Sequence, residues 1–467
     1  MPVYVYDLYP GYQVKEFTEL TTGELEFYLE CNYKALQSVF EKNPPQLAIS
    51  QHTIMQPVYT TLAISDLPET RHLITIHGSA LNFSVRKSNL LQGYARQGIK
   101  KAHGLVFLSK HSMEEFSAFF PALTRLREGY RIIPAGVDTE IFKPLEYTGE
   151  KQQRIRNLVG QLKEKIHSKG CGRTQSHQKS FHDNLRQMSE AKEISGLICD
   201  YRSKANNWLP DEDAGAKLSR LDWNRRQVIL YYGKYLWTKG VQLLIAAAPL
   251  ILMKHPQARF VLVGFGESRE FLEAMVGALD QGRIELFKQM LEAPLSFDPE
   301  GAGECFYTGG ILDYLSDPGN AQAYKEVARG HLRERVIFTG IMDHNDLRQL
   351  IPCTEFTAAP SIFPEAFGLV AIEALASGVL PVQTYHTGFA DVAKVYREEF
   401  ADIYEHLKLS PLLLNDMLVP NLAHHLNRLT EYFAQLSENE RQEIRKRAHM
   451  LAKSKFSWTT VAQKYLE

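Results

Sequence analysis

Cysteine is scarce in this chain and follows no pattern. The 467 residues include five cysteines, at positions 31, 171, 199, 305 and 353, and no two of them form a C-x-x-C pair. An odd, scattered set argues against a disulfide framework and against a structural zinc site. We therefore expect a protein of a reducing compartment, the cytoplasm, with no metal site.

Long apolar runs and an excess of charge are also missing. The longest apolar stretch, residues 241–253, is too short to cross a bilayer and contains Pro249, so it predicts a core helix. The formal net charge is −1, which gives no overall field to attract nucleic acid or an acidic membrane. The opening MPVYVYDLYPGYQ has no basic segment before an apolar core and does not resemble a secretory signal. Peripheral membrane contact and the oligomeric state stay open.

The chain is instead rich in alternating strand and helix patterns. In its first third, strands are predicted within residues 3–9, 45–52, 72–78, 102–112 and 130–144, with a Thr-capped helix within 21–43. Such alternation indicates a parallel sheet covered on both faces. Ligands lie at the carboxyl ends of the strands in these sheets, and His52, His77 and Ser109 fall at such ends.

A second run of alternation starts near residue 226, with strands predicted within 227–240, 258–268, 335–352 and 355–361. Two segments interrupt the pattern, at 145–225 and 286–332. The first is polar and basic, which favours a solvated helical insertion or partial disorder over a contact with an acidic partner. We expect an α/β protein with two doubly wound parallel-sheet domains facing a cleft. These would be residues 1–225 and 226–456, with a tail helix at 457–467 crossing back to the first domain.

The stretch PEAFGLVAIEALASGVLPV, residues 364–382, places two carboxylates in an apolar segment. It predicts a buried helix from near Gly368 to near Gly378, followed by a strand. A helix amino end suits a phosphate, and Glu373, about one turn along, suits the diol of a ribose. Glu365, in the preceding loop, would reach the hydroxyls of a second group. The alternative is a core helix with one solvent-facing carboxylate.

Two lysines and one histidine complete the candidate set. Lys234 and Lys239 lie in GKYLWTKG, after the first strand of the second half, where two ammonium groups would grip a diphosphate. Lysines in surface loops are common, and a lone G-x-G such as Gly264-x-Gly266 is more often a turn. His77, taken alone, is better explained as a core histidine with its hydrogen bonds satisfied.

Taken in order, these motifs resemble the retaining GT-B glycosyltransferases of family four, also called glycosyl transferases group 1. The C-terminal signatures of that family appear here as Gly233-Lys234 with Lys239-Gly240, Val263-Gly264-Phe265-Gly266, and Glu365-Ala366-Phe367-Gly368-Leu369 with Glu373-Ala374, Gly378 and Pro381. Its N-terminal signatures appear as His77-Gly78, Ser109, Pro134-Ala135-Gly136-Val137-Asp138 and Phe142-Lys143-Pro144. The resemblance covers roughly residues 45–145 and 226–395, and the closing FSWTTVAQKYLE resembles the family's last helix.

The resemblance implies transfer of a hexose from a nucleotide-sugar donor to an acceptor hydroxyl, with retention of configuration and without cofactor or metal ion. Glu373 would bind the donor ribose and Glu365 the donor sugar. Lys234 and Lys239 would neutralise the diphosphate, and His77 would approach the sugar from the opposite domain. The donor would also meet the backbone near Phe367, Gly368, Leu369, Gly233 and Gly264.

Four features depart from the family pattern. Lys234 replaces an Arg, Ala135 replaces an Asn, and Thr387-Gly388 replaces a Gly-Gly turn. The family's opening strand and glycine-rich loop are expected to be absent, because the first strand here corresponds to a later one. Two other functions stay open: a sugar-nucleotide epimerase on the same fold, and a non-catalytic nucleotide-sugar-binding or regulatory subunit.

Overall fold

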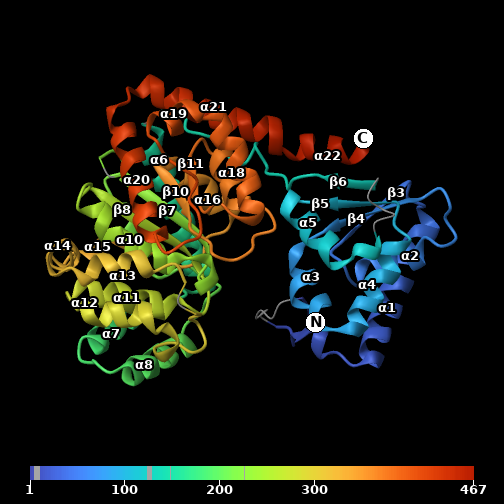
Figure 1. Ribbon diagram of the computed structural model, residues 1–467, viewed down its shortest axis with the longest axis horizontal. Coiled ribbons are helices and arrows are strands. Elements are labelled where there is room, and N and C mark those ends of the chain that lie inside the picture. The colour runs from blue at the N-terminus through green and yellow to red at the C-terminus, as the bar shows by residue number, and fades with distance from the viewer. Residues whose placement is uncertain (5–10, 124–128, 148, 226, 305) are drawn as a thin grey trace.

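Two separate parallel sheets organise the protein, as the computed structural model shows (Figure 1). The structure describes residues 1–4, 11–123, 129–147, 149–225, 227–304 and 306–467. Among these residues, the parallel sheets and the alternating helices confirm the predicted α/β class. Within the same residues, none of the helices has the length and apolar content needed to span a bilayer.

The first sheet has the order β3-β4-β5-β6, and all of its pairs are parallel. Its strands are β3 (Leu47–Gln51), β4 (Arg71–Ile76), β5 (Gly104–Phe107) and β6 (Tyr130–Ile132). The helices of this region are α1 (Thr22–Lys42), α2 (Gln56–Ala63), α3 (Gly78–Phe83), α4 (Asn89–Lys100) and α5 (Lys110–Phe119), with the 3-10 turns η1 (Phe17–Glu19) and η2 (Val85–Lys87). Thr21 caps α1 as its sequence predicts, since its side chain accepts a hydrogen bond from the Glu24 backbone N–H.

The predicted first strand, residues 3–9, lies mostly outside the described residues. Residues 5–10 lie outside the described residues. The neighbouring β1 (Pro2–Val3) pairs with β2 (Lys15–Glu16) in a separate two-stranded sheet. The pairing shows that β1 is no part of the four-stranded sheet.

The second sheet has the order β11-β10-β7-β8-β9, again all parallel. Its strands are β7 (Gln227–Lys234), β8 (Ala258–Phe265), β9 (Val336–Phe338), β10 (Phe356–Ala359) and β11 (Leu380–Gln383). Its helices include α10 (Val241–Leu252), α11 (Arg269–Asp280), α15 (Leu332–Arg335), α16 (His344–Leu350), α17 (Leu369–Ala376), α18 (Thr387–Glu399), α19 (Ala401–His406), α20 (Leu418–Gln435) and α21 (Glu438–Phe456), with the 3-10 turns η4 (Trp237–Lys239) and η6 (Ile351–Cys353). Helix α10 is buried apart from Leu250, as its apolar sequence predicts.

The basic segment 145–225 is helical and belongs to the core around the second sheet, which corrects its predicted place in the first domain. It forms α6 (Glu150–Lys169), α7 (Gln175–Leu185), α8 (Ala191–Ser203) and α9 (Ala214–Ser219). Leu158, Phe181, Ile198 and Leu218 are buried in one cluster with the strands β7 and β8. The charged composition masks an apolar face at helical spacing, and burial of that face fixes the helices in place.

The second predicted insertion, residues 286–332, joins the same core. It contains α12 (Ile284–Glu292), η5 (Pro294–Ser296), α13 (Gly309–Ser316) and α14 (Pro318–Ala328). Phe287, Ile311 and Tyr324 are buried there, and the Tyr324 hydroxyl donates a hydrogen bond to the Ala246 carbonyl of α10 at 2.8 Å.

The tail helix α22 (Trp458–Leu466) continues from α21 onto the first sheet (Figure 1). Val461 packs against Val106 of β5 and Ile133, and the hydroxyls of Tyr465 and Thr75 lie 2.9 Å apart. The last helix therefore bridges the two domains and adds side chains to the space between them.

Candidate functional site

A cavity of about 700 Å³ lies between the two sheets, at the carboxyl ends of their strands. The first domain contributes Gln51, Thr75, His77 and Leu108 to its walls, the second contributes Tyr231, Gly233, Lys234, Lys239, Ser361, Glu365, Phe367, Gly368 and Leu369, and the tail helix contributes Trp458, Val461 and Tyr465. Polar and charged groups thus cluster on the side of the second domain, while the tail presents mainly apolar and aromatic surface.

Lys239 and Glu365 form an ion pair on the cavity wall. The Lys239 ammonium nitrogen lies 2.5 Å from Glu365 Oε1, and the Ser361 hydroxyl donates to the same oxygen at 2.7 Å. Lys239 also lies over the Phe363 ring, 5.6 Å from its centre. With 30% of the lysine and 17% of the glutamate side chain exposed, the pair is fixed by packing but open to a ligand in the cavity.

Lys234 ends β7 beside the same cavity. Gly233, just before it, has a φ of 149°, which a side-chain-bearing residue rarely adopts. The Tyr231 hydroxyl donates to the Lys234 carbonyl at 2.7 Å, and the lysine ammonium lies 5.8 Å from the centre of the Phe265 ring. The Gly233 backbone and the Tyr231 hydrogen bond therefore fix the end of β7 in a conformation that places Lys234 at the cavity.

The amino end of α17 opens on the cavity. Gly368 caps the helix with a φ of 156°, and a Cβ added there would lie 3.0 Å from the Phe389 ring. The Phe367 side chain is buried, with its ring centre 5.9 Å from that of Phe456. Mainly the backbone of Phe367 is therefore available to a ligand. The N–H groups of Leu369 and Val370 precede the first bonded amide, that of Ala371, which donates to the Gly368 carbonyl at 3.1 Å, so they can bind an anion.

Glu373 lies one turn further along α17 and does not line the cavity. Its Oε1 is 3.4 Å from His344 Nε2, and 13% of its side chain is exposed. The hydrogen bond to Glu373 raises the pKa of His344. The buried Tyr232 is also next to this carboxylate, and its pKa is raised by burial first and then by the Glu373 charge. Glu373 is thus at the border of the site, between Tyr232 and His344.

His77 approaches the cavity from the first domain. It ends β4 and precedes α3, its Nε2 lies 2.8 Å from Gln51 Oε1, and its ring centre lies 4.6 Å from that of His52. Burial lowers its pKa, so the ring is neutral near pH 7. His52 and Ser109, also at strand ends, do not line the cavity, and Ser109 instead caps α5 through Ser112.

Gly264 does not line the cavity either. A Cβ added to it would lie 1.9 Å from the carbonyl oxygen of Gly233 on the neighbouring strand. Its close approach keeps β7 and β8 together directly beneath the Lys234 loop. Its place in the structure is that of a packing glycine, whereas the sequence resemblance implies a donor contact.

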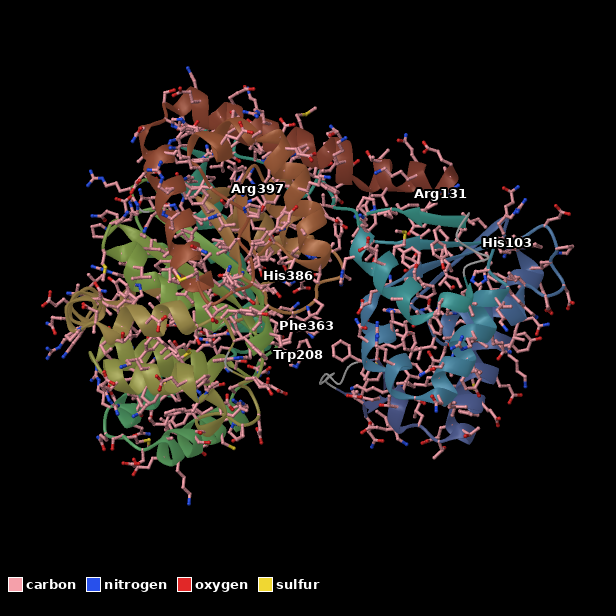
Figure 2. All side chains as sticks on the ribbon, viewed as in Figure 1. His103, Arg131, Trp208, Phe363, His386 and Arg397 are labelled. Carbon is pink, nitrogen blue, oxygen red and sulfur yellow. The ribbon has the colours of Figure 1, made fainter. Side chains whose placement is uncertain are left out.

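The two walls of the cavity touch each other. The rings of Phe83 and Phe363 stack across the domains with centres 5.6 Å apart and planes 11° apart. The Lys110 backbone N–H donates to Asp391 Oδ2 at 2.6 Å. Figure 2 shows Phe363 and His386 on the side of the second domain that faces the first. These contacts set the distance at which His77 faces Lys239 and Glu365.

Several lining residues are not among the candidates that the sequence indicates. Tyr231 and Ser361 reach the cavity only through the fold, and His344 reaches Glu373 from α16. Trp458 and Tyr465 belong to the predicted tail helix, whose sequence indicates no contact with the cavity. In the part of the chain that the structure describes, no group of three or more His, Cys, Asp or Glu side chains is placed to hold a metal ion.

Comparison with known proteins places residues 219–290 and 309–400 in the profile of the family described as Glycosyl transferases group 1. The chain is 24% identical to an uncharacterized glycosyltransferase of Methanocaldococcus jannaschii over 36% of its own length and 30% of the relative's. It is also 24% identical to the mannosylfructose-phosphate synthase of Agrobacterium fabrum, over 56% of this chain and 44% of that protein. The matches thus span less than half the length of these curated relatives.

Among solved structures, sucrose-phosphate synthase of Thermosynechococcus elongatus is similar, with a TM-score of 0.50 and 17% identity over 96% of this chain and 78% of that chain. At this identity the likeness concerns the fold. The unmatched residues 291–308 between the two profile segments fall inside the predicted insertion at 286–332. Residues 219–290 and 309–400 match the profile of the glycosyl transferases group 1 family, and the two Rossmann-like domains of the chain form a GT-B fold.

Proposed function

We propose that this protein is an enzyme that transfers a hexose from a nucleotide-sugar donor to an acceptor hydroxyl with retention of configuration. One observation carries the proposal above all others. The ion pair of Lys239 and Glu365 lies on the wall of a cavity of about 700 Å³, into which the amino end of α17 also opens. A cation, a carboxylate and free helix amides together match a diphosphate joined to a sugar.

The cations would bind the diphosphate. Lys239 and Lys234 both line the cavity, and the first-turn amides of α17 face it at Gly368 and Leu369. Breaking the bond between sugar and phosphate leaves negative charge on the departing diphosphate. Donors already fixed around that position stabilise the charge without reorganising, which lowers the barrier. In this proposal no metal ion is needed, because these groups supply the positive charge.

The carboxylates would bind hydroxyl groups. Glu365 is held by Lys239 and Ser361 through Oε1, which leaves Oε2 to accept from hydroxyls of the donor sugar. Glu373 would accept from the ribose at the outer end of the donor, where His344 now contacts it. His77 is neutral and faces the cavity from the other domain, so its ring can exchange a hydrogen bond with the transferred sugar.

The relatives support a transfer reaction without fixing its partners. Two of them are named as synthases, of mannosylfructose phosphate and of sucrose phosphate. Both names describe sugar-to-sugar linkages, so we include a sugar hydroxyl among the acceptors to be tested. The scattered cysteines, four of which are free thiols in the described residues, lead us to place the reaction in the cytoplasm.

The test begins with the melting temperature of the full chain against a panel of nucleotide sugars, because a ligand of the native state raises it. The stabilising donor is then incubated with sugars and sugar phosphates, and nucleoside diphosphate release and the product anomer are measured. Acceptor-dependent release with the donor's anomeric configuration is expected. Inversion would refute retention, and binding without transfer or hydrolysis would favour a binding subunit.

A further inference from the structure

The second domain has a further cavity, of about 670 Å³. Figure 1 shows that α7, α11 and α15, which line it, lie on the part of the domain away from the first. The cavity is enclosed by α7, α9, α11, α15 and the edge strand β9. Its basic lining residues are Arg186, Lys217, Arg220, Arg259 and Arg333, and the neutral His182 lies among them. None of them belongs to the nucleotide-sugar site proposed above.

Four acids also line this cavity, but two of them are already neutralised. Glu273 pairs with the fully buried Arg269 at 2.6 Å, and Asp213 pairs with Lys217 at 2.9 Å. The remaining two are Asp280 and Glu334. An Asp280 carboxylate oxygen accepts the Arg333 backbone N–H at 3.2 Å.

Lys217 itself is fully engaged. Its ammonium donates to Gln178 Oε1 at 2.7 Å and to the Phe338 carbonyl at 2.9 Å, in addition to its contact with Asp213. Lys217 thus satisfies the Phe338 carbonyl at the end of the edge strand β9 and is not available to a ligand. The cations left to act in the cavity are therefore guanidinium groups.

Arg220 and Arg333 are the guanidiniums that stand out. In the described part of the chain neither forms an ion pair with an acid, although Arg333 is only partly exposed. Burial lowers the pKa of Arg333; the charges of Asp280, Glu273 and Asp183 oppose that effect, and the charge of Arg186 adds to it. An anion between these side chains would offset both the desolvation and the mutual repulsion.

We propose that this cavity is a binding site for a small phosphorylated anion, held by Arg220 and Arg333 with support from Arg186. A guanidinium presents paired N–H donors that match two phosphate oxygens. Three such groups line the cavity, from α15, the end of α9 and the end of α7, and the third, Arg186, also pairs with Asp183 at 3.6 Å. The cavity volume leaves room for a further polar group attached to it. The site is separate from the nucleotide-sugar cavity and does not depend on the proposed transfer reaction.

Titration calorimetry on the full chain tests the site, with orthophosphate, pyrophosphate and glycerol 3-phosphate as ligands. Because pyrophosphate would also meet Lys234 and Lys239, the same titrations are run on a variant with Lys234→Ala and Lys239→Ala. We expect binding to persist in that variant and to weaken at least tenfold in Arg220→Ala/Arg333→Ala. Arg225→Ala, which changes an arginine with an 87% exposed side chain outside the cavity, is the matched control and should bind as the parent does.

Arg220→Gln provides a second variant, since Arg220 is exposed and its replacement leaves the fold intact. It should weaken binding severalfold with an unchanged melting temperature. Tighter binding of glycerol 3-phosphate than of orthophosphate would assign the site to phosphorylated metabolites, and the reverse order to free phosphate. Equal affinity in the parent and both arginine variants, or no binding once Lys234 and Lys239 are replaced, would overturn the proposal.

Discussion

Lys239 and Glu365 are 126 residues apart in the chain, yet the lysine ammonium lies 2.5 Å from a carboxylate oxygen of the glutamate. The lysine ends a 3-10 turn after β7, and the glutamate lies in the loop before α17. The two loops meet because β7 and β10 are neighbours in the sheet. This contact joins the cation-bearing loop to the helix amino end, so both line the same cavity.

Replacing Lys239 by Ala should lower turnover about 10²–10³-fold, because a cation aimed at the leaving group stabilises the transition state more than the bound donor. Donor affinity should fall less. Initial rates and calorimetric donor affinity measure the two effects separately. Lys254→Ala, which removes a largely exposed lysine of the same domain, is the control. Full turnover in Lys239→Ala would refute the role.

Chelation provides an independent prediction about the same charge. If lysines and helix amides neutralise the charge of the diphosphate, EDTA should leave turnover within about twofold of its value in chelator-free buffer. The measurement is the initial rate before and after dialysis against the chelator, with Mg²⁺ added back as a control. Loss of activity that Mg²⁺ restores would show that a metal ion supplies the charge that we assign to Lys234 and Lys239.

Replacing Glu373 by Ala should weaken nucleotide binding by about 1.5–3 kcal/mol, as expected for a lost hydrogen bond to a charged group. The fold should tolerate the change, since the side chain contacts the exposed ring of His344 and lies at the border of the cavity. Calorimetry with the nucleoside diphosphate and a thermal melt measure both effects. Unchanged affinity in a folded variant would show that the ribose binds elsewhere.

The contact between His344 and Glu373 also predicts a pH effect. The glutamate raises the pKa of His344 above its ordinary value of about 6.5. The pair therefore makes its full contribution to the stability of the fold below about pH 6.5, the ordinary pKa of histidine. That contribution is lost as the pH rises through the raised pKa of His344. The histidine side chain is 73% exposed, so the stability change is small and the ring titration is the sharper measurement.

NMR titration of the His344 ring should give a raised pKa in the parent and a lower one in Glu373→Gln. His344→Gln identifies the resonance by removing it. An identical His344 pKa in the parent and Glu373→Gln would mean that the pair does not form in solution.

Much of the fold follows from local sequence. The strands β7, β8 and β10 are predicted well because each is an apolar run that ends at a polar or glycine-containing loop. The α1 cap is equally clear, since the Thr21 side chain accepts a hydrogen bond from the Glu24 backbone N–H as predicted. These features depend on neighbouring residues only, which is why the chain alone reveals them.

The sheet to which an insertion belongs depends on distant partners. The helices of residues 145–225 are held against the second domain by contacts such as Arg173 with Glu270, 97 residues away, at 2.5 Å. Nothing near Arg173 in the sequence indicates that partner. The polar composition suggested a solvated surface, and only the packing of the apolar faces shows otherwise.

The residues that line the site can be predicted where they belong to short sequence motifs. They cannot be predicted where a single side chain reaches the site from an element without such a motif. Lys234, Lys239, Glu365 and His77 all line the cavity, as the ordered motifs predict, although their roles await the tests above. Trp458 and Tyr465 reach it from the tail helix, which the sequence predicts without indicating a contact with the cavity, and His344 reaches Glu373 from α16 without any local pattern.

Gly264 gives the last prediction, because its place in the structure differs from the donor contact that the resemblance implies. A Cβ at this position would lie 1.9 Å from the Gly233 carbonyl oxygen, so Gly264→Ala must push β7 and β8 apart. We expect a loss of about 1–3 kcal/mol in the free energy of unfolding, as for other overpacked sites, measured by urea denaturation. Because Gly233 precedes Lys234, turnover should fall as well.

Gly160→Ala is the matched control, since Gly160 lies within α6 and a Cβ there meets no atom within 4 Å. That variant should gain roughly 0.5–1 kcal/mol, because alanine restricts the unfolded chain and favours the helix. The contrast separates the two explanations of Gly264. A packing glycine loses stability when it becomes alanine, and donor affinity then falls with it. A glycine that only admits the donor would keep its stability in Gly264→Ala and lose affinity alone, which would restore the donor-contact assignment.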